Sequence, residues 1–481
     1  MNMKTKKEKE AQANSNLLYN ISDKPRTVKE WILYSLQMVL AVFVATVLIA
    51  NICGTPVSAC LLGACIGTLV YQLITRFKSP MFISSSGATV SAVIGALALS
   101  ETVGHQNYLM VAIGGLVILA VYALFALLVR IRGVESINKI FPPTVVGPVT
   151  MVIGLNLATF LLGYTHNSAT WEVIIAVLTM FVIAVSSHYF KGFLKTIPFL
   201  IGLAFGYILA LIVTWIGWAD LVSFEPFHHL SWYPDLVFLK WTGADFSWSY
   251  VLQTIILFVP VAICALLEHY SDHKTLSNII GTDLTVTPGL DKTLLGDGVA
   301  SAVGTAVCGL PNTSYGEGIA TVGFSRVASV WVVTAAAIFM GVLSFFAPVS
   351  AFIQTIPSCV FGGCAFILYG FIAASGLKTL MRSKPDLENT KNLIVVSVIL
   401  TAGVSGIFLF SASFAGVSLA MVLGVILNLI LRDKKEDGKE ASDNGGKEGN
   451  TNKVGGSKKS RKIEEQFDAP ETTTTTTETI N

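Results

Sequence analysis

Long runs of hydrophobic residues, separated by short polar connections, dominate the chain from residue 31 to residue 431. Most of these runs approach the ~20 residues that a helix needs to cross a bilayer. About fourteen runs can be distinguished, at 31–50, 56–75, 82–99, 108–130, 143–163, 171–189, 194–217, 249–270, 292–309, 312–324, 327–347, 350–376, 392–410 and 412–431. The pattern predicts an all-α polytopic membrane protein with about fourteen transmembrane segments.

The two ends of the chain differ from this hydrophobic part. Residues 1–30 are polar and charged, with no apolar core of a cleavable signal peptide, so we expect a loose N-terminal segment. Residues 432–481 are rich in Lys, Asp, Gly and Ser and then carry a Thr run at 472–477. Such a composition cannot form a packed core and predicts a disordered tail.

The placement of basic residues predicts the orientation of the segments. Lys and Arg gather in alternate connections, and the connections between them hold almost none. By the positive-inside rule both termini are cytoplasmic, which requires an even number of segments. An aromatic-rich external loop at 218–248 divides the runs into seven in 31–217 and seven in 249–431. An odd number in each half predicts that the two halves are inverted repeats, as in secondary transporters.

One run in each half is interrupted in the same way. The third contains KSPMFISSSGATVSAV and the tenth GLPNTSYGEGIATV, each with Pro, then Ser, Thr and Gly, then an apolar stretch. This pattern favours an extended stretch leading into a half-helix whose N-terminus faces a central cavity. Elsewhere, glycines such as Gly362, Gly363 and Gly370 are expected to allow close helix packing.

Composition narrows the class of protein. Hydrophobic residues make up 53% of the 481 residues and charged residues 13%, against roughly 25% charged residues in soluble domains. The net charge of +2 gives no reason to expect a nucleic acid partner, and the surroundings predicted are the lipid bilayer. Seven cysteines lie in or beside apolar runs without a CxxC pair, so we expect packing residues.

Glu317 is the strongest candidate for a functional residue. It lies in the interrupted tenth run, and no Lys or Arg is nearer in sequence than Arg326. A charge in hydrocarbon costs about 2.5–3.5 kcal/mol on insertion scales. Such a carboxylate is kept where it binds a ligand, faces water or takes up a proton, which indicates a substrate site near the middle of the membrane.

Glu268 is a second candidate, but hydropathy leaves two interpretations open. It follows an apolar run of about 18 residues and begins the polar stretch EHYSDHK. It could accept hydrogen bonds from a ligand, or it could be solvated where a helix leaves the membrane. The sequence has no Walker A, HExxH or GxSxG motif and no metal-spaced cluster, so we expect neither an enzyme nor a metal site.

Several stretches, in this order, resemble one known family: LQMVLAVFVATVL, FPPTVVGPVTMVIGL, LLEHYSDHKTLSNIIG, GLPNTSYGEGIA and ILYGFIAASGLKTL. From about Leu36 to Leu431 the chain resembles the nucleobase–ascorbate transporter (nucleobase:cation symporter-2) family, and within it the bacterial uracil permeases. The resemblance implies fourteen segments in two inverted seven-segment repeats, core and gate domains, and short β-strands in the third and tenth segments. It also implies a homodimer in the bacterial inner membrane.

The resemblance further implies proton-coupled uptake of uracil by alternating access, with no cofactor besides the coupling proton. Glu268 and Glu317 match the two carboxylates that hold the pyrimidine ring in the family. The other substrate-binding positions that it implies are Tyr315, Gly316, Ser86, Gly87 and Ala41. The proton is expected on Glu268, Asp272 or His273. An ionised carboxylate accepts from the ring N–H groups, and a protonated one donates to a ring carbonyl.

The chain departs from the family pattern at some positions. Gly87 stands where uracil permeases have an aromatic residue, and Asp272 stands where they have His. Purine transporters of the family tend to have an amide at the position of Glu317, so this residue favours uracil. A xanthine or other purine permease is the main alternative. An anion transporter of the same fold would have a cationic or neutral site, and an ion channel would not show saturable uptake.

Overall fold

The computed structural model describes residues 17–100, 106–133, 142–158, 170–241, 244–405 and 415–431. The predicted tail at 432–481 and residues 1–16 lie outside the described residues. Within the described ranges the chain is mainly helical, with one pair of very short strands.

The first half of the chain forms these elements: α2 (Val28–Cys53), α3 (Val57–Ile74), β1 (Ile83–Ser85), η1 (Gly87–Thr89), α4 (Val90–Leu97), α5 (Tyr108–Arg132), α7 (Pro143–Leu157), α9 (Thr170–Tyr189), η3 (Gly192–Thr196) and α10 (Pro198–Ile216). The long connection that follows contains two short 3₁₀ helices, η4 (Glu225–His228) and η5 (Val237–Lys240).

The second half forms α11 (Trp248–Ile280), η6 (Thr285–Gly289), α12 (Leu290–Cys308), β2 (Asn312–Ser314), α13 (Gly316–Ser325), α14 (Val330–Ser344), α15 (Ala347–Gln354), α16 (Ser358–Arg382), α17 (Thr390–Val404) and α18 (Ala415–Ile430). Each half of the chain therefore contains one short strand followed by a short helix.

Among the described residues, seven helices are long and apolar enough to cross a membrane. The number is eight if α14 and α15, which meet at a bend of 76°, form one span. Shorter apolar helices lie at Gly87–Leu97, Pro143–Leu157, Thr390–Val404 and Leu419–Ile430. The prediction of a multi-pass helical membrane protein is confirmed, and the count of fourteen stays a prediction.

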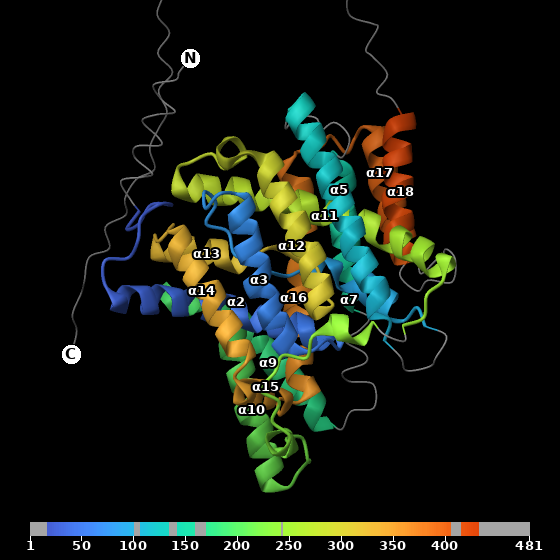
Figure 1. Ribbon diagram of the computed structural model, residues 1–481. Helices are drawn as coiled ribbons and strands as arrows, with labels where there is room; N and C mark the ends of the chain where they lie inside the picture. The colour runs from blue at the N-terminus through green and yellow to red at the C-terminus, as the bar shows by residue number, and fades with distance from the viewer. Residues whose placement is uncertain are drawn as a thin grey trace, which may run out of the picture. The chain divides into compact units, whose positions relative to one another are not determined.

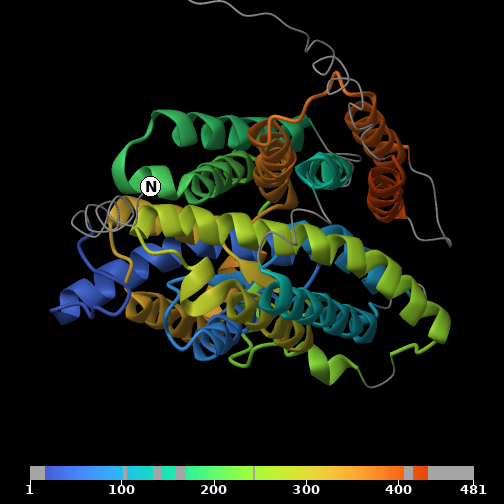
Figure 2. The ribbon, with the colours of Figure 1, turned by 90° about the horizontal axis from the view of Figure 1, so that it is seen from above.

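The helices form two groups (Figures 1 and 2). In the first group α12 packs against α3 and α5, and α14 packs against α2 and α3. In the second group α16 packs against α7 and α9, and α17 lies beside α18. Figure 2 shows α11, which belongs with the first group, running along the boundary between them; it contacts α7 and α18 there.

Close packing in the second group depends on glycines of α16. A Cβ atom at Gly363 would lie 2.4 Å from the carbonyl oxygen of Ala176, and one at Gly376 would lie 2.5 Å from that of Gly147. Both glycines let backbones touch, as is common between membrane helices. The prediction is confirmed for Gly363 but wrong for Gly370, where a Cβ atom would meet nothing within 4 Å.

The structure differs from the sequence analysis at two further places. Hydropathy ends the eighth run at residue 270, whereas α11 has 33 residues and continues to Ile280. The loose N-terminal segment is a wrong prediction for residues 17–30, because Tyr19 is 5% exposed and α2 already begins at Val28. The seven cysteines are all buried, as predicted.

Candidate functional site

The site is built around two breaks in the helical packing. Strands β1 and β2 pair antiparallel, with Ser84 opposite Thr313 in the middle of the register. Beyond the strands, Ser86 N–H donates to the Pro311 carbonyl at 2.8 Å. At the other end, Tyr315 N–H donates to the Phe82 carbonyl at 3.2 Å. The two extended stretches thus satisfy each other's backbone groups before the chain turns into η1 and α13, as backbone at membrane depth requires.

Asn312 fixes β2 between two helices. Its Nδ2 donates to the Gly63 carbonyl of α3 at 2.8 Å, and the Ser301 hydroxyl of α12 donates to the backbone carbonyl of Asn312. Only glycine leaves room for the amide on either side: Cβ atoms at Gly67 and Gly304 would lie 2.5 Å and 2.6 Å from Nδ2. The strand that leads to Glu317 is therefore held from both α3 and α12.

The length of α11 decides between the two interpretations of Glu268. Because the helix continues to Ile280, Glu268 lies inside it and not at its end. Residues four apart share a helix face, so Glu268 and Asp272 point one way, and His269 and His273 point another. Glu268 is solvent-exposed and Asp272 half-buried, whereas both histidines are fully buried.

The carboxylate face of α11 meets β2 and α13. Ser314 lies three residues before Glu317, and its hydroxyl donates to Asp272 Oδ2 at 2.8 Å. The packing of α11 against β2 and α13 places the helix that carries Glu268 and Asp272 beside the half-helix that carries Glu317. Within the described part of the chain none of these three has a Lys or Arg partner within ion-pair distance. Like charges held together without a cation are costly at membrane depth, and a bound proton or a ligand with N–H groups would relieve that cost.

The histidine face of α11 meets a buried polar network. His269 Nδ1 lies 2.5 Å from Asp297 Oδ2 of α12, and neither side chain is exposed. His273 Nε2 lies 2.7 Å from the Tyr71 hydroxyl, which lies 2.9 Å from Ser79 Oγ. His273, one of the predicted proton-coupling residues, is thus turned away from Glu317.

Asp297 is a residue that the sequence analysis missed. Its other oxygen, Oδ1, is buried without a hydrogen-bond partner among the described residues, as is Nε2 of His269. The same signal that identified Glu317 was present, because Asp297 is a carboxylate inside the apolar stretch LLGDGVASAVG. An acidic group this deeply buried is either structural or part of the site's proton chemistry.

The remaining predicted residues lie on the elements around the carboxylates. Tyr315 is 5% exposed, whereas Gly316 is exposed and a Cβ atom there would meet nothing within 4 Å. Ala41 is buried in α2, which packs against α13. Ser86 is buried at the start of η1. At Gly87 a Cβ atom would lie 3.6 Å from Ile372 of α16, so this residue lies where the two helix groups meet.

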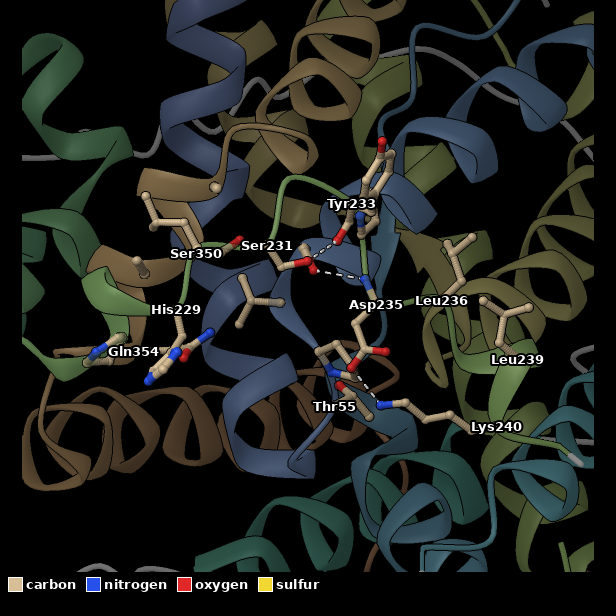
Figure 3. A pocket seen from close by; sticks show the side chains of 18 of the residues that line it. Thr55, His229, Ser231, Tyr233, Asp235, Leu236, Leu239, Lys240, Ser350 and Gln354 are labelled. Atoms are coloured by element: carbon tan, nitrogen blue, oxygen red, sulfur yellow. Dashed lines mark hydrogen bonds and ion pairs between the residues drawn. The ribbon is translucent and has the colours of Figure 1, made fainter. Parts of the chain in front are cut away.

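A cavity of about 660 Å³ lies apart from these residues, beneath the aromatic-rich loop (Figure 3). It is lined by the α2–α3 connection, residues 226–240 and α15, and by none of the predicted site residues. In it, Lys240 pairs with Asp235 at 2.6 Å, and Asp235 N–H donates to Ser58 Oγ at 3.3 Å. The loop thus folds back onto the start of α3, and the cavity that it lines is separate from the carboxylate residues.

Comparison with known sequences identifies relatives of the whole hydrophobic part. A model of a permease family matches residues 29–412. The uracil permease of Bacillus subtilis (strain 168) is 37% identical over 426 residues, which cover 86% of this chain and 95% of that protein. The uracil permease of Escherichia coli (strain K12) is 34% identical over 426 residues, covering 86% of this chain and 93% of that protein.

Solved structures share the fold at low sequence identity. The transmembrane domain of the cyanobacterial bicarbonate transporter BicA matches with a TM-score of 0.57 at 14% identity, covering 85% of this chain and 99% of that domain. The murine anion transporter Slc26a9 matches with a TM-score of 0.60 at 11% identity, covering 85% of this chain and 69% of that one. At such identities the likeness extends to the fold alone.

Proposed function

The chain belongs to the nucleobase:cation symporter-2 permease family, and on this premise we propose that it takes up uracil together with protons across the bacterial inner membrane. The observation that carries the proposal is the packing of α11, which carries Glu268 and Asp272, against β2 and the half-helix that begins with Gly316 and Glu317. Three carboxylates on adjoining elements, with no Lys or Arg within ion-pair distance among the described residues, favour a ligand that donates hydrogen bonds, and uracil has two ring N–H groups.

Each part of the proposed site has a role that follows from its chemistry. Glu268 and Glu317 accept from the ring N–H groups, and Tyr315 and Gly316 present backbone groups at the start of α13. Ser86, Gly87 and Ala41 line the opposite side, on η1 and α2. Gly87 carries no side chain, which leaves that side of the base in contact with small or aliphatic groups.

Among the three candidates for the coupling proton, Asp272 has the most direct link to the substrate. It lies on the same face of α11 as Glu268, and its bond from Ser314 connects it to the strand before Glu317. Protonation of Asp272 would remove a negative charge beside both substrate-binding carboxylates. His273 is buried against Tyr71, which makes it a weaker candidate.

We further propose alternating access, in which the first helix group is the core domain and the second is the gate domain. The position of Gly87 beside Ile372 supports movement of the core site along the face of α16. The two inverted repeats at 31–217 and 249–431, cytoplasmic termini and a homodimer are proposed from the sequence pattern and the family.

The test is uptake of labelled uracil by proteoliposomes that contain the purified protein, with an inwardly directed proton gradient. Glu317→Ala should abolish uptake, because it removes an acceptor that faces the base. Glu225→Ala is the matched control, since Glu225 is exposed in the loop and outside the carboxylate cluster. Normal uptake by the Glu317→Ala protein at equal reconstitution would refute the site.

Competition experiments separate the alternatives. Excess xanthine that blocks uracil uptake, or xanthine uptake without uracil uptake, would indicate a purine permease. The fold neighbours named as bicarbonate and anion transporters make anion transport worth measuring in the same vesicles. The acidic cluster argues against it, because carboxylates repel anions.

A further inference from the structure

Residues Leu17–Thr27, which precede α2, form a clasp on the far end of the half-helix that carries Glu317. Leu18 N–H donates to the Arg326 carbonyl at 2.8 Å, and Ala328 N–H donates to the Tyr19 carbonyl at 2.9 Å. Val330 N–H then donates to the Ile21 carbonyl at 2.9 Å. These are parallel-strand contacts between segments about 300 residues apart in the chain. We call residues Leu17–Thr27 the N-terminal clasp.

Side chains anchor the clasp to the start of α2. The Tyr19 ring is buried with Val327 and Val332, and the Tyr19 hydroxyl donates to Glu30 Oε2 at 2.8 Å. Glu30 also accepts from the backbone of Thr27, which closes the capping box of α2. One carboxylate therefore joins the beginning of α2 to the side chain that covers the end of α13.

Further contacts extend the clasp over the start of α14. The Ser329 hydroxyl donates to the Asp23 carbonyl at 2.5 Å, and Lys24 Nζ lies 4.6 Å from the centre of the Trp331 ring. Trp331 stacks on Phe77 of the connection that leads to β1. The clasp thus joins the chain segments next to α2, β1 and α13, all of which support the proposed substrate site.

The helix α13 connects the clasp at its C-terminal end to Glu317 at its N-terminal end. The helix has ten residues, so it is about 15 Å long, with Glu317 in its first turn and Arg326 just past its end. Arg326 has the left-handed φ of 58°, which is uncommon for a residue other than glycine. The Leu18 and Tyr19 N–H groups both point at its carbonyl, at 2.8 Å and 3.4 Å. The clasp therefore holds the residue at which α13 ends, in addition to the packing of the helix against α2 and α11.

We propose that the N-terminal clasp is a positioning element that sets the place of α13, and through it of Glu317, in the substrate site proposed above. Its residues do not contact the substrate. They act through the short helix α13, whose N-terminal end contacts the substrate in the proposed site. Loosening the clasp should therefore weaken substrate binding while leaving the chain folded in the membrane.

The sharpest test removes one backbone donor, with a control that matches the loss of the side chain. Leu18→Pro deletes the N–H that bonds to Arg326, and Leu18→Ala is the matched control that keeps it, because the Leu18 side chain is 56% exposed. A thiol introduced by Gly316→Cys in both backgrounds reports the start of α13 by its rate of maleimide alkylation. The native cysteines are buried. This readout does not depend on which substrate is carried.

We expect the alkylation rate of that thiol to differ between Leu18→Pro and Leu18→Ala by about two- to thirtyfold, the range given by couplings of about 0.5–2 kcal/mol. Without the Gly316→Cys change, the KM for uracil should rise in Leu18→Pro by a factor in the same range, with unchanged protein abundance. Equal alkylation rates would overturn the proposal. A difference in rate in a protein that takes up no uracil would support the clasp and refute the proposed function.

A second variant covers the case in which Leu18→Pro does not reach the membrane. Tyr19→Phe keeps the buried ring and removes the hydroxyl, which donates to Glu30 Oε2 and accepts from the Arg26 N–H at 3.3 Å. It should change the alkylation rate and the KM in the same direction, by a smaller factor. If Tyr19→Phe matches the unmodified clasp in both measurements while Leu18→Pro fails to fold, the segment has only a structural role and the proposal is wrong.

Discussion

Replacing Asp297 by alanine should destabilise the protein more than replacing Asp235, the carboxylate of an exposed ion pair with Lys240. The Asp297 and His269 side chains are 0% exposed, with 2.5 Å between Oδ2 and Nδ1. In the Asp235–Lys240 pair the side chains are 54% and 39% exposed, with 2.6 Å between the charged atoms. The two pairs have nearly the same distance and differ in their surroundings.

The surroundings set the expected magnitudes. Removing one partner of a buried hydrogen-bonded pair leaves the other buried and unsatisfied, which costs about 1–3 kcal/mol, and more where that group is charged. An exposed pair is worth about 0–1 kcal/mol, since water solvates each partner when the other is removed. The buried variant therefore loses a sizeable part of the roughly 5–15 kcal/mol that stabilises a typical folded protein.

Thermal unfolding of the purified proteins in one detergent measures this difference. The midpoint for Asp297→Ala should fall by several degrees, and that for Asp235→Ala should stay close to the parent. Asp297→Asn should lie between the parent and Asp297→Ala, because an amide of the same shape can still form a hydrogen bond with His269. Equal midpoints for Asp297→Ala and Asp235→Ala would show that the buried pair does not stabilise the fold and would refute the reasoning.

Three further predictions follow from other parts of the structure. Gly363→Ala should lower the unfolding temperature, since its Cβ would lie 2.4 Å from the Ala176 carbonyl, whereas Gly370→Ala should be tolerated; equal effects would contradict the packing. Ser314→Ala should reduce uracil uptake at normal protein abundance, because it removes a hydrogen bond to a carboxylate, worth about 1.5–3 kcal/mol when Asp272 is ionised. Uptake should rise as the external pH falls, because external protons are then more abundant, and a protonophore should abolish the accumulation; uptake independent of the gradient would exclude proton coupling.

The sequence predicts those features that depend on local pattern. Glu317 stands out because a carboxylate interrupts an apolar run, and the third and tenth runs stand out by their Pro, Ser, Thr and Gly residues. Hydropathy ended α11 too early because the residues after Glu268 are polar, and a hydropathy profile treats polar residues as the end of a membrane segment. They face a carboxylate cluster on one side and a buried histidine network on the other.

The features that sequence analysis missed depend on contacts between distant parts of the chain. The N-terminal clasp is polar and looks loose, but its partners lie about 300 residues away, at Arg326 to Val330. Gly363 and Gly370 are seven residues apart on one helix, and only the position of α9 makes the first one indispensable for packing. Asp297 carried a readable signal, but its partner His269 lies on another helix.

The two faces of α11 connect these observations. Glu268 and His269 are adjacent in sequence, but successive residues in a helix point about 100° apart, so one reaches the open carboxylate cluster and the other a closed pair with Asp297. The His269–Asp297 contact ties this face of α11 to α12, because turning the helix would break the 2.5 Å contact. That contact favours the direction in which Glu268 and Asp272 point. The buried network thus gives the carboxylate face a defined geometry, and the proposed substrate site depends on residues that never contact the substrate.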